Sequence, residues 1–237
     1  LIAPVLLICA LIAPADLSTS VVLFITCFIL MFMGRASLNH LGLIVGGGII
    51  TGALMISLLF SLPQDILDKT GRLATWKSRI VAFVDDEAAV PYQIQQTKIA
   101  IAKGGLVGEG PGKSSQRNFL PHPYSDFIYA IVLEEYGFLG GMFVLSLYLI
   151  LLFRTIQIVI KSPGAFGALL ALGLMINLVI QALTNMAVAV NLLPVTGLTL
   201  PFISMGGTSL FFTSISLGVV LSVSRNIELS KEKSKDE

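Results

Sequence analysis

Six long stretches of the chain are apolar on nearly every side, without the regular alternation that marks a half-buried strand. They cover about residues 1–14, 17–34, 41–62, 126–153, 165–190 and 197–224. About 18 or more apolar residues in one helix suffice to cross the hydrocarbon core of a bilayer, and all but the first stretch reach that length. The pattern predicts an all-α, polytopic membrane protein with about six transmembrane helices, the first of them truncated.

The composition supports the same class of protein. The 237-residue chain is 55% hydrophobic and only 12% charged, with a mean hydropathy of +0.88. Soluble domains carry about 25% charged residues, so the composition excludes disorder and disfavours a soluble globular fold. The net charge of +1 argues against a nucleic-acid-binding surface. Both cysteines, Cys9 and Cys27, lie inside apolar stretches and predict neither a disulfide nor a metal pair.

The first apolar stretch begins without a methionine or a basic segment, which is untypical of a signal peptide. We therefore expect the chain to be the C-terminal part of a longer membrane protein. Four regions are predicted. They are transmembrane spans in 1–62, a large extracytoplasmic loop with interfacial helices in 63–125, three transmembrane spans in 126–224 and a cytoplasmic tail in 225–237.

Basic residues in the short connections predict the orientation. Arg35 lies between the second and third spans, Arg154 and Lys161 lie near the connection of the fourth and fifth, and Arg225 begins the tail. Alternating crossings place these sites on one side of the membrane, which the positive-inside rule makes cytoplasmic. The short connections on the other side contain no Lys or Arg. The long loop then lies outside the cell membrane.

The long loop contains a basic stretch near its start. Arg72, Lys77 and Arg79 surround Trp76, with no acid among them. This composition suits an interfacial helix that contacts anionic lipid head groups, and a solvated helix face is the alternative. Long loops on a rigid scaffold are also places where function concentrates.

A glycine-rich stretch, residues 104–112, leads into Lys113. Gly112, Lys113 and Ser114 copy the end of a P-loop, but Val107 stands where that motif needs its first glycine. An external loop would also not meet ATP, so we reject nucleotide binding. Two interpretations remain. The stretch is either a flexible turn between interfacial helices, or a loop whose backbone N–H groups and Lys113 bind an anionic phosphate.

Asp126 is the most distinctive polar residue, because it opens an apolar stretch at the predicted outer face. It is either a helix-start residue stabilised by the helix dipole, or an ionised group that accepts a proton or holds a divalent cation. Glu134 and Glu135 follow within the span, where carboxylates face protein or a wet cavity. At 100° per residue, Glu134 lies about 80° around the helix from Asp126 and Glu135 about 180°. We therefore expect Glu134 to share a cavity with Asp126.

Further polar residues border or interrupt the spans. Asp16 either caps the second span or belongs to a site. Asn177, Gln181 and Asn185 recur every four residues on one helix face, which is more typical of contacts between helices than of a binding site. A broken helix at the entry to the last span must line protein or a cavity, because lipid cannot satisfy its backbone. The interrupting residues are Pro194, Pro201, Gly206 and Gly207.

Taken together, these residues resemble the SEDS family (shape, elongation, division and sporulation proteins), the multi-span glycosyltransferases that polymerise peptidoglycan. The matching segments occur in family order and cover nearly the whole chain. They are PADLST at 14–19, YQIQQ at 92–96, GGLVGEG at 104–110, SDFIYA at 125–130, EEYG at 134–137 and GLTLPFISMGGTS at 197–209. Family members normally have ten spans, so the resemblance implies the last six or so. Residues 110–116 and 197–201 are more similar to the cell-division branch of the family.

The resemblance implies a glycosyltransferase that polymerises lipid II and releases undecaprenyl diphosphate, in septal wall synthesis of a dividing bacterium. Asp126 would be the catalytic residue, which deprotonates or orients the acceptor hydroxyl or holds a divalent cation, Mg²⁺ or Mn²⁺; no other cofactor is implied. The implied location is the bacterial inner membrane, and the implied partners are a class B penicillin-binding protein and other divisome proteins. Candidate substrate-binding residues are Arg72, Gln93, Gln96, Lys113, Gln116, Arg117, Glu134, Ser204, Gly206 and Gly207.

Two other functions fit part of the pattern. A lipid II flippase would use intramembrane carboxylates and broken helices for alternating access. A non-catalytic scaffold for a transpeptidase would need neither. A transporter should depend on polar residues at the midplane of the bilayer, whereas a polymerase should depend on Asp126 at the outer face.

Overall fold

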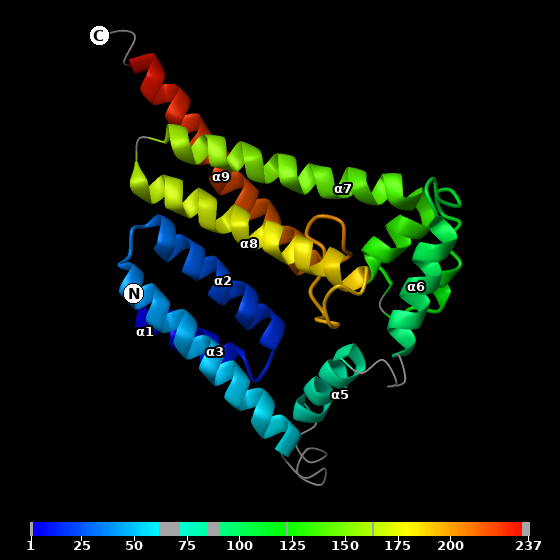
Figure 1. Ribbon diagram of the computed structural model, residues 1–237. Helices are drawn as coiled ribbons and strands as arrows, with labels where there is room; N and C mark the ends of the chain where they lie inside the picture. The colour runs from blue at the N-terminus through cyan, green and yellow to red at the C-terminus, as the bar shows by residue number, and fades with distance from the viewer. Residues whose placement is uncertain (1, 62–71, 85–90, 122, 163, 234–237) are drawn as a thin grey trace.

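The computed structural model describes residues 2–61, 72–84, 91–121, 123–162 and 164–233, and the regular elements within these ranges are all helical (Figure 1). The elements are α1 (Ile2–Ile12), α2 (Leu17–Met33), α3 (Leu38–Ser61), α5 (Arg72–Val84), α6 (Tyr92–Gly104), the short 3₁₀ helix η1 (Gln116–Asn118), α7 (Ile128–Lys161), α8 (Ala165–Ala189) and α9 (Gly207–Lys233).

Each apolar stretch predicted from the sequence contains one of these helices. In the described part of the chain, α7, α8 and α9 are long and apolar enough to cross a membrane, while α1, α2 and α3 hold shorter apolar stretches. The chain is therefore an all-α, polytopic membrane protein. The last span begins at Gly207 instead of residue 197, because the chain before it turns sharply and bonds to other elements. The predicted tail continues α9 to Lys233, and residues 234–237 lie outside the described residues.

The connections between helices gather at two ends of the bundle, as Figure 1 shows. One end holds the α2–α3 and α7–α8 connections and the C-terminal end of α9. The other end holds the α1–α2 connection, α5, α6 and the chain between α8 and α9. The basic connections predicted to share one side therefore do lie at one end.

Helix α8 is the centre of the bundle, and it packs against α2, α7 and α9. Its small and aliphatic side chains form a buried cluster with α7, in which Ala182 is fully buried. A polar contact also joins α8 to α2, because the Thr26 hydroxyl donates to Oδ1 of Asn177 at 3.4 Å. This contact confirms the predicted role of Asn177 between helices.

Helix α7 bends at Gly137, where the backbone angles are φ 66° and ψ −169°. The N–H groups that follow the bend cannot reach their partners in the preceding turn, so they bond to the chain after α6. Phe138 donates to the carbonyl of Gly105 at 2.9 Å, and Leu139 donates to that of Leu106 at 3.2 Å. A Cβ atom at Gly137 would collide with this crossing chain. The bend and the chain crossing therefore depend on each other.

Gly104 at the end of α6 provides a test of this crossing. A methyl group there would collide with the carbonyl of Leu133 on α7, whereas one at Gly52 on α3 would meet nothing within 4 Å. We predict that Gly104→Ala lowers the free energy of unfolding by roughly 1–3 kcal/mol, the usual cost of overpacking. The matched change Gly52→Ala should leave the thermal unfolding temperature in detergent within error of wild type or raise it. Equal unfolding temperatures for the two variants would contradict the close crossing.

Candidate active site

Asp126 lies in the turn that leads into α7, two residues before the helix begins. Its side chain is half-buried, and Oδ1 accepts a hydrogen bond of 2.8 Å from the Ser125 hydroxyl. Phe127 occupies the N-cap position of α7, and no side chain caps this helix. Asp126 therefore does not cap α7, and its role as a proton acceptor or cation ligand stays a prediction.

Buried side chains hold the backbone of this turn. Asn185 on α8 is 1% exposed, and its Nδ2 donates to the carbonyls of both Asp126 (2.8 Å) and Leu198 (2.6 Å). The Ser204 hydroxyl donates to the carbonyl of Ser125 at 2.6 Å. These bonds join the turn that carries Asp126 to the non-helical chain before α9.

The non-helical chain before α9, residues 190–206, has further partners on α7 and α8. Nε2 of Gln181 donates to the carbonyl of Thr199 at 3.1 Å, and the Tyr148 hydroxyl donates to that of Pro201. Carbonyls that leave helical geometry in a membrane protein need such donors, because lipid offers none. The polar face predicted on α8 therefore serves mainly to hold this segment.

Gly197 brings the segment next to Asp126. Its φ of +76° lies in the left-handed region, and a Cβ atom there would be 3.8 Å from Oδ2 of Asp126. Gly197 also lines a cavity of about 390 Å³. The Asp126 carboxylate therefore lies behind one wall of that cavity, separated from it by a residue without a side chain.

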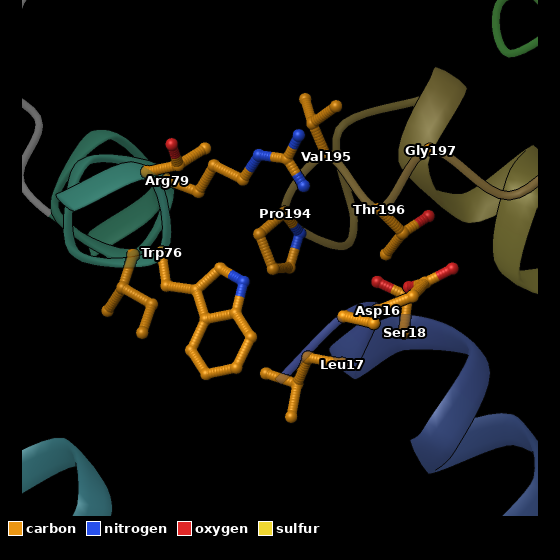
Figure 2. Close-up of a pocket in the computed structure, with 12 residues that line it drawn as sticks. Asp16, Leu17, Ser18, Trp76, Arg79, Pro194, Val195, Thr196 and Gly197 are labelled. Atoms are coloured by element: carbon orange, nitrogen blue, oxygen red, sulfur yellow. The ribbon is translucent and has the colours of Figure 1, made fainter. Parts of the chain in front are cut away.

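The cavity is bounded by the start of α2, by α5 and by residues 194–197. Figure 2 shows the Arg79 guanidinium and the Trp76 indole extending from α5 toward the 194–197 segment. Asp16 and Ser18 lie on the other side, at the start of α2. A cavity with a cation, a carboxylate and an aromatic ring in its walls suits a ligand that combines charge with sugar or lipid.

Two polar groups in the cavity wall differ in how they are satisfied. Asp16 accepts hydrogen bonds from the N–H (3.2 Å) and the hydroxyl (2.6 Å) of Thr19, so it caps α2 and lines the cavity at once. The capping role of Asp16 is therefore confirmed, and its role in a site stays a prediction. In contrast, Oγ1 of Thr196 is buried and has no hydrogen-bond partner among the described residues.

Sequence reasoning treated Arg72 and Arg79 as cations available for a diphosphate, but it selected only Arg72 as a substrate-binding candidate and gave Trp76 no role in a site. The side chain of Arg72 lies outside the described residues. Trp76 and Arg79 are three residues apart on an amphipathic helix, so they share a face. That spacing was the available signal, but only the approach of α5 to the 194–197 segment shows which face matters.

The glycine-rich loop, defined here as residues 104–117, does bind an anion, but the anion is internal. The N–H groups of Ser115 and Gln116 donate to the Glu134 carboxylate at 3.2 and 3.3 Å. Within residues 104–112, the N–H groups of Gly108, Glu109 and Gly110 bond to backbone carbonyls, so the expectation that backbone N–H groups of this stretch bind a substrate phosphate is wrong for these three. Glu134 is 0% exposed, so the expected shared cavity with Asp126 is wrong as well. The loop folds over Glu134 and closes it off.

The other candidate substrate-binding residues do not line the cavity; they are Gln93, Gln96, Lys113, Gln116, Arg117, Ser204, Gly206 and Gly207. Lys113 is exposed and Arg117 half-buried on the glycine-rich loop. Ser204 is 3% exposed and uses its hydroxyl to hold neighbouring backbone. Gln93 and Gln96 lie half-buried on α6, while Gly206 and Gly207 mark the start of α9.

No three His, Cys, Asp or Glu side chains gather into a metal-binding group within the described ranges. A divalent cation at Asp126 would take its other ligands from substrate phosphates and water. Mg²⁺ is commonly bound in this way, through one or two carboxylates and a phosphorylated substrate. A half-buried carboxylate beside a cavity fits such a site.

Comparison with known proteins now decides the family. The family described as "Cell cycle protein", which comprises FtsW, RodA and SpoVE, matches residues 1–229 of the chain. The chain belongs to the FtsW/RodA/SpoVE family. This is the family, also called SEDS, that the sequence motifs resemble.

Relatives in this family carry several names. Stage V sporulation protein E of Bacillus subtilis (strain 168) is 39% identical over 214 residues, 89% of this chain and 55% of the relative. A probable peptidoglycan glycosyltransferase FtsW of the same organism is 35% identical, over 98% of this chain and 58% of the relative. Peptidoglycan glycosyltransferase MrdB of Escherichia coli (strain K12) is 32% identical, over 89% of this chain and 55% of the relative.

The chain therefore spans little more than half the length of these curated relatives. A solved structure from the study "Structural coordination of polymerization and crosslinking by a peptidoglycan synthase complex" matches with a TM-score of 0.70 and 26% identity. The match covers 94% of this chain and 60% of that one. The FtsW/RodA/SpoVE fold is thus shared over nearly the whole chain.

Asn185 provides a test of how the Asp126 turn is held. Asn185→Ala would leave two carbonyls without their donor, at roughly 1–3 kcal/mol for each buried group. We predict a loss of about 2–4 kcal/mol in the free energy of unfolding, measured by thermal or denaturant unfolding in detergent. Asn177→Ala removes one long hydrogen bond, to Thr26, about two turns earlier on α8. It should cost less than half as much. A smaller loss for Asn185→Ala than for Asn177→Ala would contradict the assigned bonds.

Proposed function

We propose that this chain carries the catalytic part of a peptidoglycan glycosyltransferase, which polymerises lipid II into glycan strands and releases undecaprenyl diphosphate. The observation that carries the proposal is the position of Asp126. Its half-buried carboxylate lies next to Gly197, which lines a cavity together with Arg79 and Thr196. Relatives named peptidoglycan glycosyltransferases support the reaction class.

In the proposed reaction, Asp126 accepts the proton of the 4-hydroxyl group of the acceptor N-acetylglucosamine. The hydroxyl oxygen forms the new glycosidic bond to the anomeric carbon of the donor, while the bond from that carbon to the diphosphate oxygen breaks. The electron pair leaves with undecaprenyl diphosphate. Arg79 in the cavity wall offsets the negative charge that develops on this leaving group.

Residues around Asp126 keep the base in place during this step. The Ser125 hydroxyl holds Oδ1, and Asn185 fixes the backbone of the turn. A divalent cation, Mg²⁺ or Mn²⁺, held by Asp126 and the substrate diphosphate would stabilise the same leaving-group charge. The absence of a side chain at Gly197 leaves room for the reacting sugars beside the carboxylate.

We place the cavity end of the bundle at the outer face of the bacterial inner membrane and the C-terminal end of α9 in the cytoplasm. The basic residues Arg35, Lys161 and Arg225 at the other end support this orientation by the positive-inside rule. A lipid-linked sugar at the outer leaflet would then reach the cavity. The long loop, residues 63–125, is extracytoplasmic in this arrangement.

We further propose that the protein acts in septal wall synthesis with a class B penicillin-binding protein and other divisome proteins. The FtsW names of several relatives support the cell-division role. The solved structure of similar fold comes from a peptidoglycan synthase complex that couples polymerization with crosslinking, which supports a transpeptidase partner.

A lipid II flippase is a weaker alternative. It would need a free polar group in the membrane span. The carboxylate of Glu134 is not free, because it accepts hydrogen bonds from the glycine-rich loop. The names of the relatives also refer to glycosyl transfer.

The proposed base is tested by Asp126→Asn, which keeps the shape of the side chain but cannot accept the proton. We predict a fall in polymerisation rate of roughly 100-fold or more, the usual contribution of a general base. The measurement is glycan polymer formed from lipid II by the protein reconstituted in vesicles. The control is Glu228→Gln, near the C-terminal end of α9 and so far from the cavity. This variant should retain the wild-type rate. Wild-type polymerisation by Asp126→Asn would overturn the mechanism, and a wild-type protein that moves lipid II without joining it would overturn the function.

A further inference from the structure

The glycine-rich loop is built around the fully buried carboxylate of Glu134. The hydrogen-bond partners that the loop presents to this carboxylate are all donors. They are the hydroxyl of Ser114, the hydroxyl (3.0 Å) and N–H (3.2 Å) of Ser115, and the N–H of Gln116 (3.3 Å). A buried charge is tolerated only when it is bonded in this way.

The two serine hydroxyls extend the network beyond Glu134. Lys103 on α6 donates to the hydroxyl of Ser115 at 2.6 Å, so a cation compensates the carboxylate through one hydroxyl. The hydroxyl of Ser114 accepts from the N–H of Arg117 at 3.2 Å while it donates to Glu134. Each serine hydroxyl is thus both donor and acceptor.

The backbone of the loop is held on α7 as well. The N–H of Glu109 donates to the carbonyl of Glu134 at 3.0 Å, and that of Gly110 donates to the carbonyl of Glu135 at 2.9 Å. The N–H of Lys113 turns back to the carbonyl of Gly110 at 3.2 Å. The loop is therefore fixed to α7 on both sides of Lys113.

Because these backbone groups are already bonded, the charged side chains of the loop remain as its contacts for an anionic ligand. Lys113 is exposed, and Arg117, four residues later in the loop, is half-buried. Neither lines the cavity near Asp126. We propose that Glu134 is a positioning residue that holds Lys113 and Arg117 ready as a second diphosphate-binding site, separate from that cavity. The proposal rests on the glycosyltransferase function proposed above.

The chemistry of the proposed reaction requires two such sites, because donor and acceptor each carry a lipid-linked diphosphate. The diphosphate of the donor is attached to the reacting carbon, and so it lies beside Asp126 and Arg79. The diphosphate of the acceptor lies one disaccharide away from the reacting hydroxyl. The glycine-rich loop bonds to α7 at Glu134, outside the cavity that Arg79 lines. We therefore assign the loop to the acceptor diphosphate.

Preorganisation explains why a buried carboxylate would be used for this purpose. A loop that became ordered only upon binding would lose affinity by the free energy needed to order it. Glu134 orders the loop before the substrate arrives, so its loss should weaken acceptor binding and leave the chemical step unchanged. The neighbouring Glu135 is half-buried and bonds the loop only through its backbone carbonyl. It is therefore a matched control.

The first experiment measures the order of the loop without any substrate. Trypsin cuts after Lys113 and Arg117, and cleavage at these bonds reports how often the loop opens. We expect Glu134→Gln to increase the cleavage rate there roughly tenfold or more. The glutamine amide replaces an accepting oxygen with an NH₂ group, which cannot accept the hydrogen bonds that the loop donates. Glu135→Gln should be cut like wild type. Equal cleavage of the two variants would overturn the positioning role whatever the protein's activity.

The second experiment separates acceptor binding from chemistry. A lipid II analogue blocked at its 4-hydroxyl group can react only as donor, and it is held at one low concentration, so that it does not fill the acceptor site, while natural lipid II is varied. We expect Glu134→Gln and Lys113→Ala each to raise KM for natural lipid II roughly tenfold with kcat within twofold of wild type. The double variant should show no further increase, since both changes disable the same site.

Three results would contradict the acceptor site. They are an unchanged KM in Glu134→Gln, a fall in kcat alone, or additive effects in the double variant. If Glu134→Gln does not accumulate in the membrane, Ser115→Ala tests the same point, because it removes one donor and the contact of Lys103. If Asp126→Asn is inactive and these variants have normal KM, only the loop proposal fails. If Asp126→Asn is fully active, the proposed function fails first.

Discussion

The structure depends on one constraint, which is that backbone groups outside helical geometry must find partners within the protein because lipid provides none. The chain leaves helical geometry at two places that matter for function. One is the turn before α7 together with residues 190–206, and the other is the bend at Gly137. At the first, side chains such as Asn185 supply the missing donors. At the second, two segments of backbone bond to each other across glycines.

Two acids eight residues apart illustrate how environment separates reactive from structural groups. Glu134 is fully buried and surrounded by donors, so its carboxylate has no room for a substrate. Asp126 is half-buried, with the Ser125 hydroxyl as its hydrogen-bond donor, next to a cavity wall formed by Gly197. The same chemical group therefore organises the loop in one place and, in the proposed reaction, accepts the proton in the other.

Much of the fold could be predicted from long apolar runs without polar alternation. In lipid, such a run satisfies its own backbone hydrogen bonds by forming a transmembrane helix. Asp126 could be singled out for the same reason, since acids at the border of such runs are few. The role of Asn185 could be predicted only as a polar contact, because its partners at Asp126 and Leu198 lie far from it in sequence. Arg79 could be named only as one of several available cations, because many faces of a basic helix look alike until one approaches a cavity.

The amino-acid sequence by itself determined that the chain is an all-α membrane protein of the FtsW/RodA/SpoVE family, because hydropathy and ordered motifs are local properties. Only the tertiary structure decided what each polar side chain does. It turned Glu134 from an expected cavity residue into the centre of the glycine-rich loop, and it placed Arg79 and Asp16 in one cavity near Asp126. The physical reason is that a carboxylate's role depends on the donors that surround it, and here those donors come from segments that only folding brings together.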